Sequence, residues 1–141
     1  MITTFEIILR LVISVVLGGL IGWQRGRTKH PAGIRTYGLV SLGSAAFAML
    51  SAFGFGVGDN VDTSRIASQI LVGVGFIGAG IILHRGTSVM GLTTAAALWV
   101  AAAIGMAVGA GQYVIAVAVS LLTFIVLLFD DEKLQGEDKN S

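Results

Sequence analysis

The sequence predicts an all-α membrane protein with five transmembrane helices, and three observations carry this prediction. Hydrophobic residues make up 55% of the 141 residues and charged residues only 12%, against about 25% charged in soluble domains. The mean hydropathy is +0.87, and 20 glycines accompany a single proline, as in small-residue membrane helices. The long apolar runs show no strand-like alternation, so helices are the economical way to satisfy the backbone in lipid.

Five apolar runs can be read as spans of a hydrocarbon core about 30 Å thick. They lie at residues 4–23, 34–57, 65–83, 88–108 and 113–129. We therefore expect one transmembrane domain over residues 1–129, followed by a short polar cytoplasmic tail at 130–141. The N-terminal Met-Ile-Thr-Thr-Phe-Glu has no basic leader, so the first run is predicted to remain as a helix.

The nine Lys and Arg residues predict the orientation. Most fall in or beside the first connection, in the third connection or in the tail: Arg25, Arg27, Lys29, Arg35, Arg85, Lys133 and Lys139. The remaining two, Arg10 and Arg65, fall at the opposite ends of the helices. Because cytoplasmic loops carry the excess of Lys and Arg, we expect the N-terminus outside and the C-terminus in the cytoplasm.

Two halves of the chain have similar spacing. Gly19-Leu-Ile-Gly22 precedes Arg25, a loop and Gly33-Ile-Arg-Thr36, while Phe76-Ile-Gly78 precedes Arg85, a loop and Gly91-Leu-Thr-Thr94. One interpretation is a parallel repeat of helices 1–2 and 3–4, with the fifth helix as an addition. The other is that small-residue membrane helices resemble one another by composition alone.

The glycines of these runs are predicted to be helix-packing positions, because in lipid a glycine lets another helix approach closely. The positions that we expect to pack in this way are Gly18, Gly22, Gly73, Gly80 and Gly105. The stretch Gly73-Val-Gly75-Phe-Ile-Gly78 formally matches a dinucleotide-binding fingerprint. That motif must follow a strand and open a helix, whereas here it lies inside an apolar run, so we expect no nucleotide and no other cofactor.

Composition and spacing also exclude several classes of function. A net charge of +1 gives no indication of nucleic-acid binding. The absence of cysteine excludes disulfides, thiolate metal sites and a cysteine nucleophile. No catalytic triad or metal-ligand spacing stands out around the two histidines, so we expect a protein that is not an enzyme.

Several polar residues in or near the spans have a structural and a functional interpretation. Glu6 and Arg10 are four residues apart and should pair on one helical face, with Arg10 either snorkelling to the outer interface or facing the bundle. Arg65 and Gln69 are one turn apart, and Gln69 either makes an interhelical hydrogen bond or lines a polar cavity. Arg35 begins the second span and either binds anionic lipid headgroups or belongs to a site.

Two further groups are candidates. Thr93 and Thr94 open the fourth span, where their hydroxyls can bond to carbonyls one turn earlier. In the second connection, Asp59 and Asp62 are candidate ligands of a hydrated divalent cation, since magnesium needs only one or two carboxylates. The alternative is that Asp62, Thr63 or Ser64 caps the third helix.

Four blocks of sequence, in the same order, resemble the N-terminal membrane domain of the MgtC/SapB family. The matching blocks are Gly19-Leu-Ile-Gly22 with Arg25, Ala32-Gly-Ile-Arg-Thr36 with Gly43-Ser44, Arg65-Ile-Ala-Ser-Gln69 with Gly73-Val-Gly-Phe-Ile-Gly-Ala-Gly80, and Gly91-Leu-Thr-Thr-Ala-Ala96 with Leu98-Trp99 and Gly105. The resemblance covers about residues 5–125.

The resemblance implies a multi-pass protein of the bacterial inner membrane, linked to growth in low magnesium and, in pathogens, to virulence. It implies a regulator rather than a magnesium transporter, with inhibition of the ATP synthase as one proposed mechanism, and no enzymatic activity. By motif position the functional residues would be Arg35, Asp62, Arg65, Gln69, Thr93 and Thr94. Some members carry a soluble domain after the fifth helix, which we do not expect in this chain, and relatives often have proline where this chain has Thr63.

These observations lead to three hypotheses of different classes. The first is a membrane regulator that contacts lipids and other membrane proteins through its glycine faces. The second is a small transporter or channel for an ion or small solute; five helices are few for a complete pathway, so we expect a homo-oligomer, with a dimer favoured. The third is a structural subunit without a site.

Overall fold

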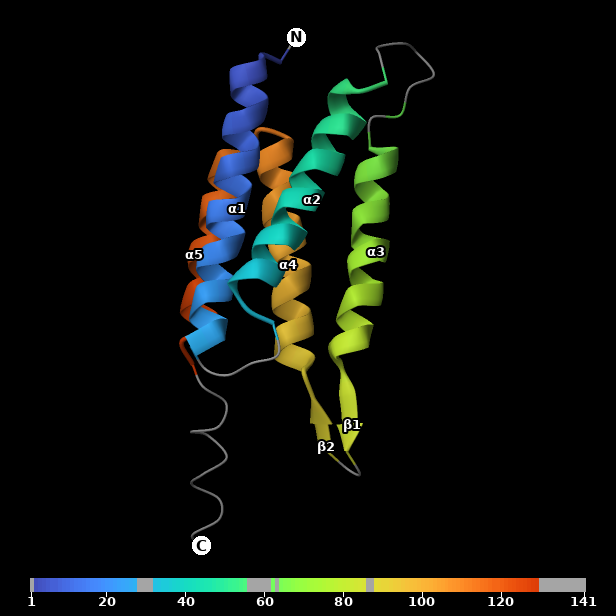
Figure 1. Ribbon diagram of the computed structural model, residues 1–141. Helices are drawn as coiled ribbons and strands as arrows, with labels where there is room; N and C mark the ends of the chain where they lie inside the picture. Colours follow the sequence, from blue (N-terminus) through green and yellow to red (C-terminus); the bar gives the residue numbers. More distant parts are fainter. Residues whose placement is uncertain (1, 28–31, 56–61, 63, 86–87, 130–141) are drawn as a thin grey trace, which may run out of the picture.

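The computed structural model describes residues 2–27, 32–55, 62, 64–85 and 88–129. They form five helices: α1 (Thr4–Arg27), α2 (Ile34–Phe53), α3 (Arg65–Ile81), α4 (Leu92–Gly109) and α5 (Tyr113–Val126). Successive helices run in alternate directions along one bundle (Figure 1). The start of α1 and the ends of α2 and α4 lie at one end of the bundle, here named the Arg10 end. The last turn of α1 and the starts of α2 and α4 lie at the other, the Arg25 end.

The prediction of an all-helical fold with five helices is confirmed, with corrections to its elements. The first helix extends to Arg27 instead of residue 23, the second ends at Phe53 instead of residue 57, and the fifth ends at Val126 instead of residue 129. A short antiparallel hairpin of β1 (Leu83–Arg85) and β2 (Ser88–Met90) joins α3 to α4. The third helix therefore ends at Ile81 instead of residue 83, and the fourth begins at Leu92 instead of residue 88. Three-residue strands are too short to show an alternating pattern in a sequence. Gly91 ends the hairpin with a φ of +88°, in the left-handed region that glycine adopts without strain.

Three of the helices, α1, α2 and α4, are long and apolar enough to cross a membrane. The other two are apolar but shorter: α3 has 17 residues and α5 has 14, which at 1.5 Å per residue gives about 26 Å and 21 Å. The alternating directions also mean that α1–α2 and α3–α4 run alike (Figure 1). The parallel repeat nevertheless stays a prediction, because any up-and-down bundle has this property.

The fourth helix is the centre of the bundle and contacts all four other helices. Leu98, Ala101, Ile104 and Val108 of α4 are fully buried, and they share a core cluster with residues from α1, α2 and α5. By contrast, Ala116 is the only buried residue of α5. Large apolar side chains such as Val114 (84% exposed) cover the outer surface, as expected where lipid is the solvent.

Glycines bring three helices into close contact at the middle of the bundle. A Cβ added at Gly18 of α1 would lie 2.5 Å from Ser41 Cβ and 2.8 Å from the Tyr37 carbonyl oxygen, both of α2. One added at Gly22 would lie 2.7 Å from Ile34 Cα. One added at Gly105 of α4 would overlap the Ser41 carbonyl oxygen. Only glycine allows backbones to approach this closely.

The glycines of α3 have different surroundings. At Gly73 and Gly80, an added Cβ would meet no described atom within 4 Å. Only Gly78 faces a neighbour, the Ala95 side chain of α4, at 3.5 Å. The predicted packing role of Gly73 and Gly80 therefore has no partner helix within the part of one chain that the structure describes.

Candidate functional site

Two arginines of α1 are buried at opposite ends of the bundle. Arg10 is 8% exposed and Arg25 is 7% exposed. The stripe of α1 between them is buried as well, and it consists mostly of small residues: Ser14, Gly18, Gly19, Ile21 and Gly22. A charge is costly to bury unless it is hydrogen-bonded. The partners of the two guanidinium groups therefore define the candidate site.

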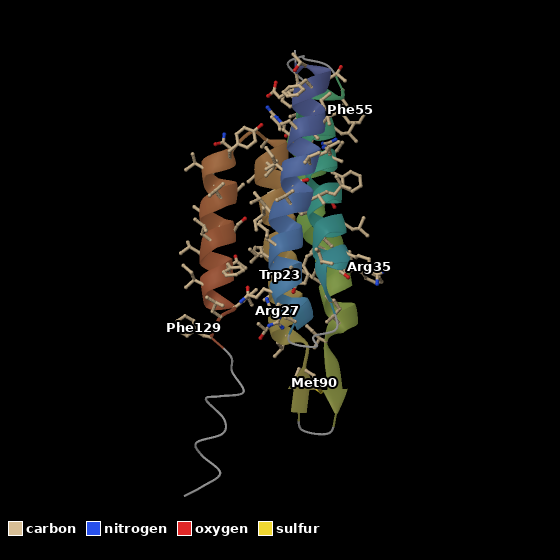
Figure 2. All side chains as sticks on the ribbon, turned by 60° about the vertical axis from the view of Figure 1, so that its left-hand side comes forward. Trp23, Arg27, Arg35, Phe55, Met90 and Phe129 are labelled. Carbon is tan, nitrogen blue, oxygen red and sulfur yellow. The ribbon has the colours of Figure 1, made fainter. Side chains whose placement is uncertain are left out.

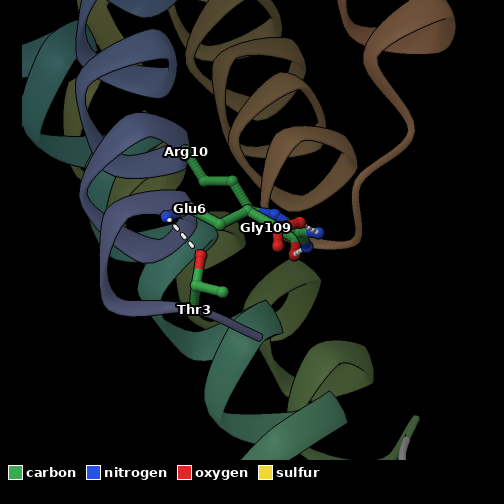
Figure 3. Close-up of polar contacts among 4 residues, drawn as sticks. All are labelled: Thr3, Glu6, Arg10 and Gly109. Carbon is green, nitrogen blue, oxygen red and sulfur yellow. Dashed lines mark hydrogen bonds and ion pairs between the residues drawn. The ribbon is translucent and has the colours of Figure 1, made fainter. Parts of the chain in front are cut away.

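The Arg10 guanidinium joins α1 to the end of α4 (Figure 3). Its Nη1 atom donates a hydrogen bond to the Gly109 carbonyl at 2.7 Å. Its Nη2 atom forms an ion pair with the Glu6 carboxylate, as the four-residue spacing predicted. The Phe53 ring at the end of α2 lies with its centroid 5.7 Å from Arg10 Cζ, within the range of a cation–π contact. Arg10 thus faces the bundle, which decides between its two interpretations.

The local structure of α4 explains why Arg10 is needed there. Gly111, with a φ of +79°, reverses the chain after the helix, and the Gln112 N–H donates to the Ala107 carbonyl at 2.8 Å, as in a Schellman motif. The Gly109 carbonyl receives the Arg10 hydrogen bond. A cation also complements the negative end of the helix dipole. Arg10 therefore acts as a tertiary C-cap of α4.

At the other end, Arg25 joins α1 to the start of α4 through Thr94. Arg25 Nη2 donates to Thr94 Oγ1 at 3.0 Å, and Arg25 also interacts with the Tyr37 hydroxyl of α2. The Tyr37 hydroxyl in turn lies 3.5 Å from the Thr94 carbonyl. All three side chains are buried, so this polar cluster holds α1, α2 and α4 together.

A matched pair of substitutions tests the cluster. Thr94 is 1% exposed, whereas its neighbour Thr93 is exposed. We expect Thr94→Val to lower the free energy of unfolding by about 2 kcal/mol, because the buried guanidinium loses an acceptor. Thr93→Val should change it by less than about 0.5 kcal/mol. Denaturant titration in detergent micelles measures both, and equal effects would contradict the role of Arg25.

Between the two clusters lies the hydroxyl of Ser41, which is fully buried. It has no hydrogen-bond partner among the described residues. Ser14, also fully buried, donates to the Leu11 carbonyl of its own helix at 2.7 Å. These hydroxyls lie between closely packed helices, so the interior of the bundle is polar at both ends and tightly packed in the middle.

The structure brings only one of the six residues marked by motif position into this interior, namely Thr94. Arg35, Asp62, Arg65, Gln69 and Thr93 are exposed. Arg35 extends away from α2 near the Arg25 end (Figure 2). There Arg27 stacks on the Trp23 ring, with 4.9 Å between Arg27 Cζ and the ring centroid. Arg65 and Gln69 are exposed side chains of the first two turns of α3.

Asp62 lies in a turn just before the third helix, and no side chain caps this helix at its N-cap residue Ser64. Its Oδ1 atom accepts hydrogen bonds from the Ser64 hydroxyl at 2.7 Å and from the Ser64 N–H at 2.9 Å. The other predicted cation ligand, Asp59, lies outside the described residues. Within the described ranges, no group of three or more His, Cys, Asp or Glu residues comes together to hold a metal ion. The geometry of Asp62 is that of an Asx turn that leads into α3, so the expected side-chain cap by Asp62 or Ser64 is not found, and Thr63 lies outside the described residues.

The hydrogen bonds between Asp62 and Ser64 make the turn before α3 sensitive to acid. The hydrogen bonds from the Ser64 hydroxyl and N–H lower the pKa of Asp62 below its ordinary value of 3.8. Because this pKa is lower in the folded state than in the unfolded chain, the ionised carboxylate stabilises the fold at any pH above the pKa of the unfolded chain. This contribution is lost as the pH falls through the lower pKa of the folded state. We expect amide exchange in the first turn of α3 to accelerate below about pH 4 relative to the intrinsic rate. In Asp62→Ala this pH dependence should disappear.

Sequence reasoning missed Arg25 and Tyr37 as parts of the site. Arg25 counted only as a cytoplasmic charge, because it lies near the end of an apolar run. A signal was present, however. Arg10, Ser14, Gly18, Gly22 and Arg25 recur at spacings of four and three, which places them on one helical face. A stripe of small residues with an arginine at each end predicts burial of both arginines.

Two shallow apolar grooves lie on the surface of the described residues. The larger, of about 290 Å³, lies between α2 and α3. Gly43 and Ser44 of α2 line it on one side, and Ile70, Gly73 and Ile77 of α3 on the other. The second lies between α1 and α2 and is entirely apolar.

These features define a class: a helical membrane protein with a glycine-packed centre and a buried arginine at each end. The chain matches the MgtC family over residues 11–134. It therefore belongs to the MgtC family, which confirms the resemblance seen in the sequence motifs.

Curated relatives agree with this assignment. The chain is 46% identical over 131 residues to "Putative magnesium transporter YhiD" of Escherichia coli K12, covering 88% of this chain and 60% of the relative. It is 42% identical over 119 residues to "Protein MgtC" of Salmonella typhimurium LT2, covering 84% and 49%. A "Protein MgtC" of Brucella abortus is 46% identical over 98 residues, covering 70% and 40%. The chain thus spans between two fifths and three fifths of these relatives. No solved structure matches it.

Proposed function

We propose that this chain is a non-enzymatic regulator in the bacterial inner membrane. In this proposal it is linked to magnesium limitation and acts by lateral contact with other membrane proteins such as the ATP synthase. The observation that carries the proposal is the closed centre of the bundle, where Gly18 and Gly105 leave no room for even one added carbon atom beside Ser41. A bundle packed this closely between α1, α2 and α4 can act through its outer surface, and these contacts leave no room for a solute between the three described helices.

The distribution of charge supports the orientation that the proposal needs. Arg25, Arg27 and Arg35 lie at one end of the bundle, and we assign this end to the cytoplasm. The Arg10 end then faces outward, with Glu6 and Asp62. In this orientation the cytoplasmic end can bind anionic lipid headgroups through Arg35.

The link with magnesium rests on the relatives. One carries the name of a magnesium transporter and others the family name, which makes transport the second candidate. The close packing of α2 against α1 and α4 in the centre of the bundle opposes it, however. A cation pathway would therefore have to run between copies of the chain, along exposed residues such as Gln69.

Purification in mild detergent from a bacterial host, followed by mass spectrometry, tests the regulator. We expect a stoichiometric membrane partner, and a changed rate of ATP hydrolysis when the chain is reconstituted with ATP synthase. A host that lacks its own copy should regain growth in low magnesium when this chain is supplied. Failure of all three would contradict the proposal.

Liposome flux assays test the transporter. On the regulator hypothesis, vesicles that contain the chain should pass magnesium no faster than empty vesicles. Flux that Gln69→Ala reduces, but that Thr93→Val leaves unchanged, would favour transport instead. Both side chains are exposed, so neither substitution should disturb the fold.

A further inference from the structure

One face of α3 is open and has the pattern of a helix–helix seam. Gln69, Gly73, Phe76 and Gly80 follow one another at spacings of four, three and four, which is the repeat of a left-handed helix pair. All four are exposed, and Phe76 is 85% exposed, the most of any described large apolar side chain. We call these four residues the α3 seam.

The glycines of the α3 seam are not explained by contacts within the chain. Each costs a helix about 1 kcal/mol relative to alanine, and close approach by another helix offsets this cost. Gly73 and Gly80 have no described atom within 4 Å of an added Cβ. The exposed helix α5 differs from α3 in this respect. Its sequence contains no glycine, as expected for a helix surface that packs against lipid alone.

The end of the α3 seam is complementary to itself. Asp62 and Arg65 carry opposite charges and are both exposed. In a symmetric pair of parallel helices each residue lies at the depth of its own copy, so Asp62 of one copy lies about one turn from Arg65 of the other. Gln69, one turn further, carries both a donor and an acceptor, so it can pair with its own copy across a two-fold axis. A lipid chain satisfies none of these groups.

We propose that the α3 seam binds a second copy of this chain, with two parallel α3 helices crossing at Gly73 and Gly80. Phe76 of each copy packs against Gly73 and Gly80 of the other. The groove of about 290 Å³ beside Gly73 provides space for the Phe76 ring. This inference rests on the proposed function in one respect, namely that the chain works through lateral contacts, and it names the first of these contacts.

The exposed side chains of this face can supply part of the area that an interface needs. An aromatic side chain buries about 150–250 Å², so the two Phe76 rings contribute on the order of 300–500 Å². Val72, Ile77 and Phe47 flank the seam and are 67%, 44% and 53% exposed. Together with the glycine backbones they bring the total toward the roughly 1,200 Å² at which stable interfaces begin.

Single-cysteine cross-linking tests the dimer in native membranes, because the chain has no cysteine of its own. We expect Phe76→Cys to form a disulfide-linked dimer on mild oxidation. Leu122→Cys is the matched control, since Leu122 is 63% exposed and lies in the middle of α5. It should give at least about tenfold less dimer. Equal cross-linking of the two variants would overturn the proposal.

Glycine substitution tests the seam itself. Gly73→Leu and Gly80→Leu should shift the chain from dimer to monomer, measured by native mass spectrometry, while its unfolding transition stays unchanged. A dimer that survives both substitutions would overturn the proposal. The proposed function is tested separately: a monomeric Gly80→Leu variant that still binds its partner and restores growth in low magnesium contradicts the dimer but not the regulator.

Discussion

Replacing Gly105 by alanine is expected to cost about 3 kcal/mol of folding free energy, at the upper end of ordinary overpacking. The added carbon would overlap the backbone carbonyl of Ser41. A backbone atom in a buried helix cannot rotate away, so α2 and α4 would have to separate along their length. Stabilities of 5–15 kcal/mol are typical of folded domains, and a loss of this size should also reduce the amount of protein in the membrane.

Gly75→Ala, in α3 but outside the α3 seam, is the control for this experiment. It adds the same atom to another apolar helix, at a position with no described neighbour within 4 Å. Because alanine is the better helix former, the folding free energy should stay the same or rise slightly. Denaturant titration in micelles and quantification in membranes measure both variants. If the two substitutions cost the same, the close contact between α2 and α4 is not the reason for Gly105.

Replacing Arg10 by methionine is expected to cost about 2 kcal/mol, the value of a hydrogen bond from a charged donor. Methionine replaces the apolar stem of the side chain, but it leaves the Gly109 carbonyl without its donor at 2.7 Å. It also removes the positive charge from the negative end of α4. Amide exchange should therefore accelerate in the last turn of α4 more than at its start.

Glu6→Gln separates the two interactions of Arg10. The Glu6 side chain is 39% exposed, so solvent screens the ion pair and its loss should cost less than about 1 kcal/mol. The hydrogen bond from Arg10 to Gly109 remains in this variant. A cost for Glu6→Gln as large as that for Arg10→Met would mean that the ion pair, and not the C-cap, determines the effect. Combining the two substitutions in a double-mutant cycle gives the coupling energy directly.

Much of the fold could be predicted from local patterns. Long apolar runs fixed the number and approximate bounds of the helices, because a backbone in lipid has few other ways to satisfy its hydrogen bonds. The Glu6–Arg10 pair followed from a spacing within one helix. The hairpin at 83–90 did not, because its two strands are too short for any periodicity.

The candidate site was less predictable, because its contacts join residues far apart in the chain. Arg25 and Thr94 are 69 residues apart, and Arg10 and Gly109 are 99 apart. Motif position singled out Thr94 but gave it no partner. It also singled out Arg35, Arg65 and Gln69, which the fold leaves on the surface.

The sequence by itself determined the class of protein, its five helices and its membership of the MgtC family, since hydropathy and local motifs are properties of the chain alone. Only the tertiary structure decided which glycines meet a neighbour. Gly18, Gly22 and Gly105 lie where two helices are in close contact, whereas Gly73 and Gly80 lie on the outer surface with no described neighbour. Glycine occurs both at buried helix crossings and on the outer surface. Which of the two a given glycine occupies depends on where a second helix lies, and the packing of the whole bundle sets that position.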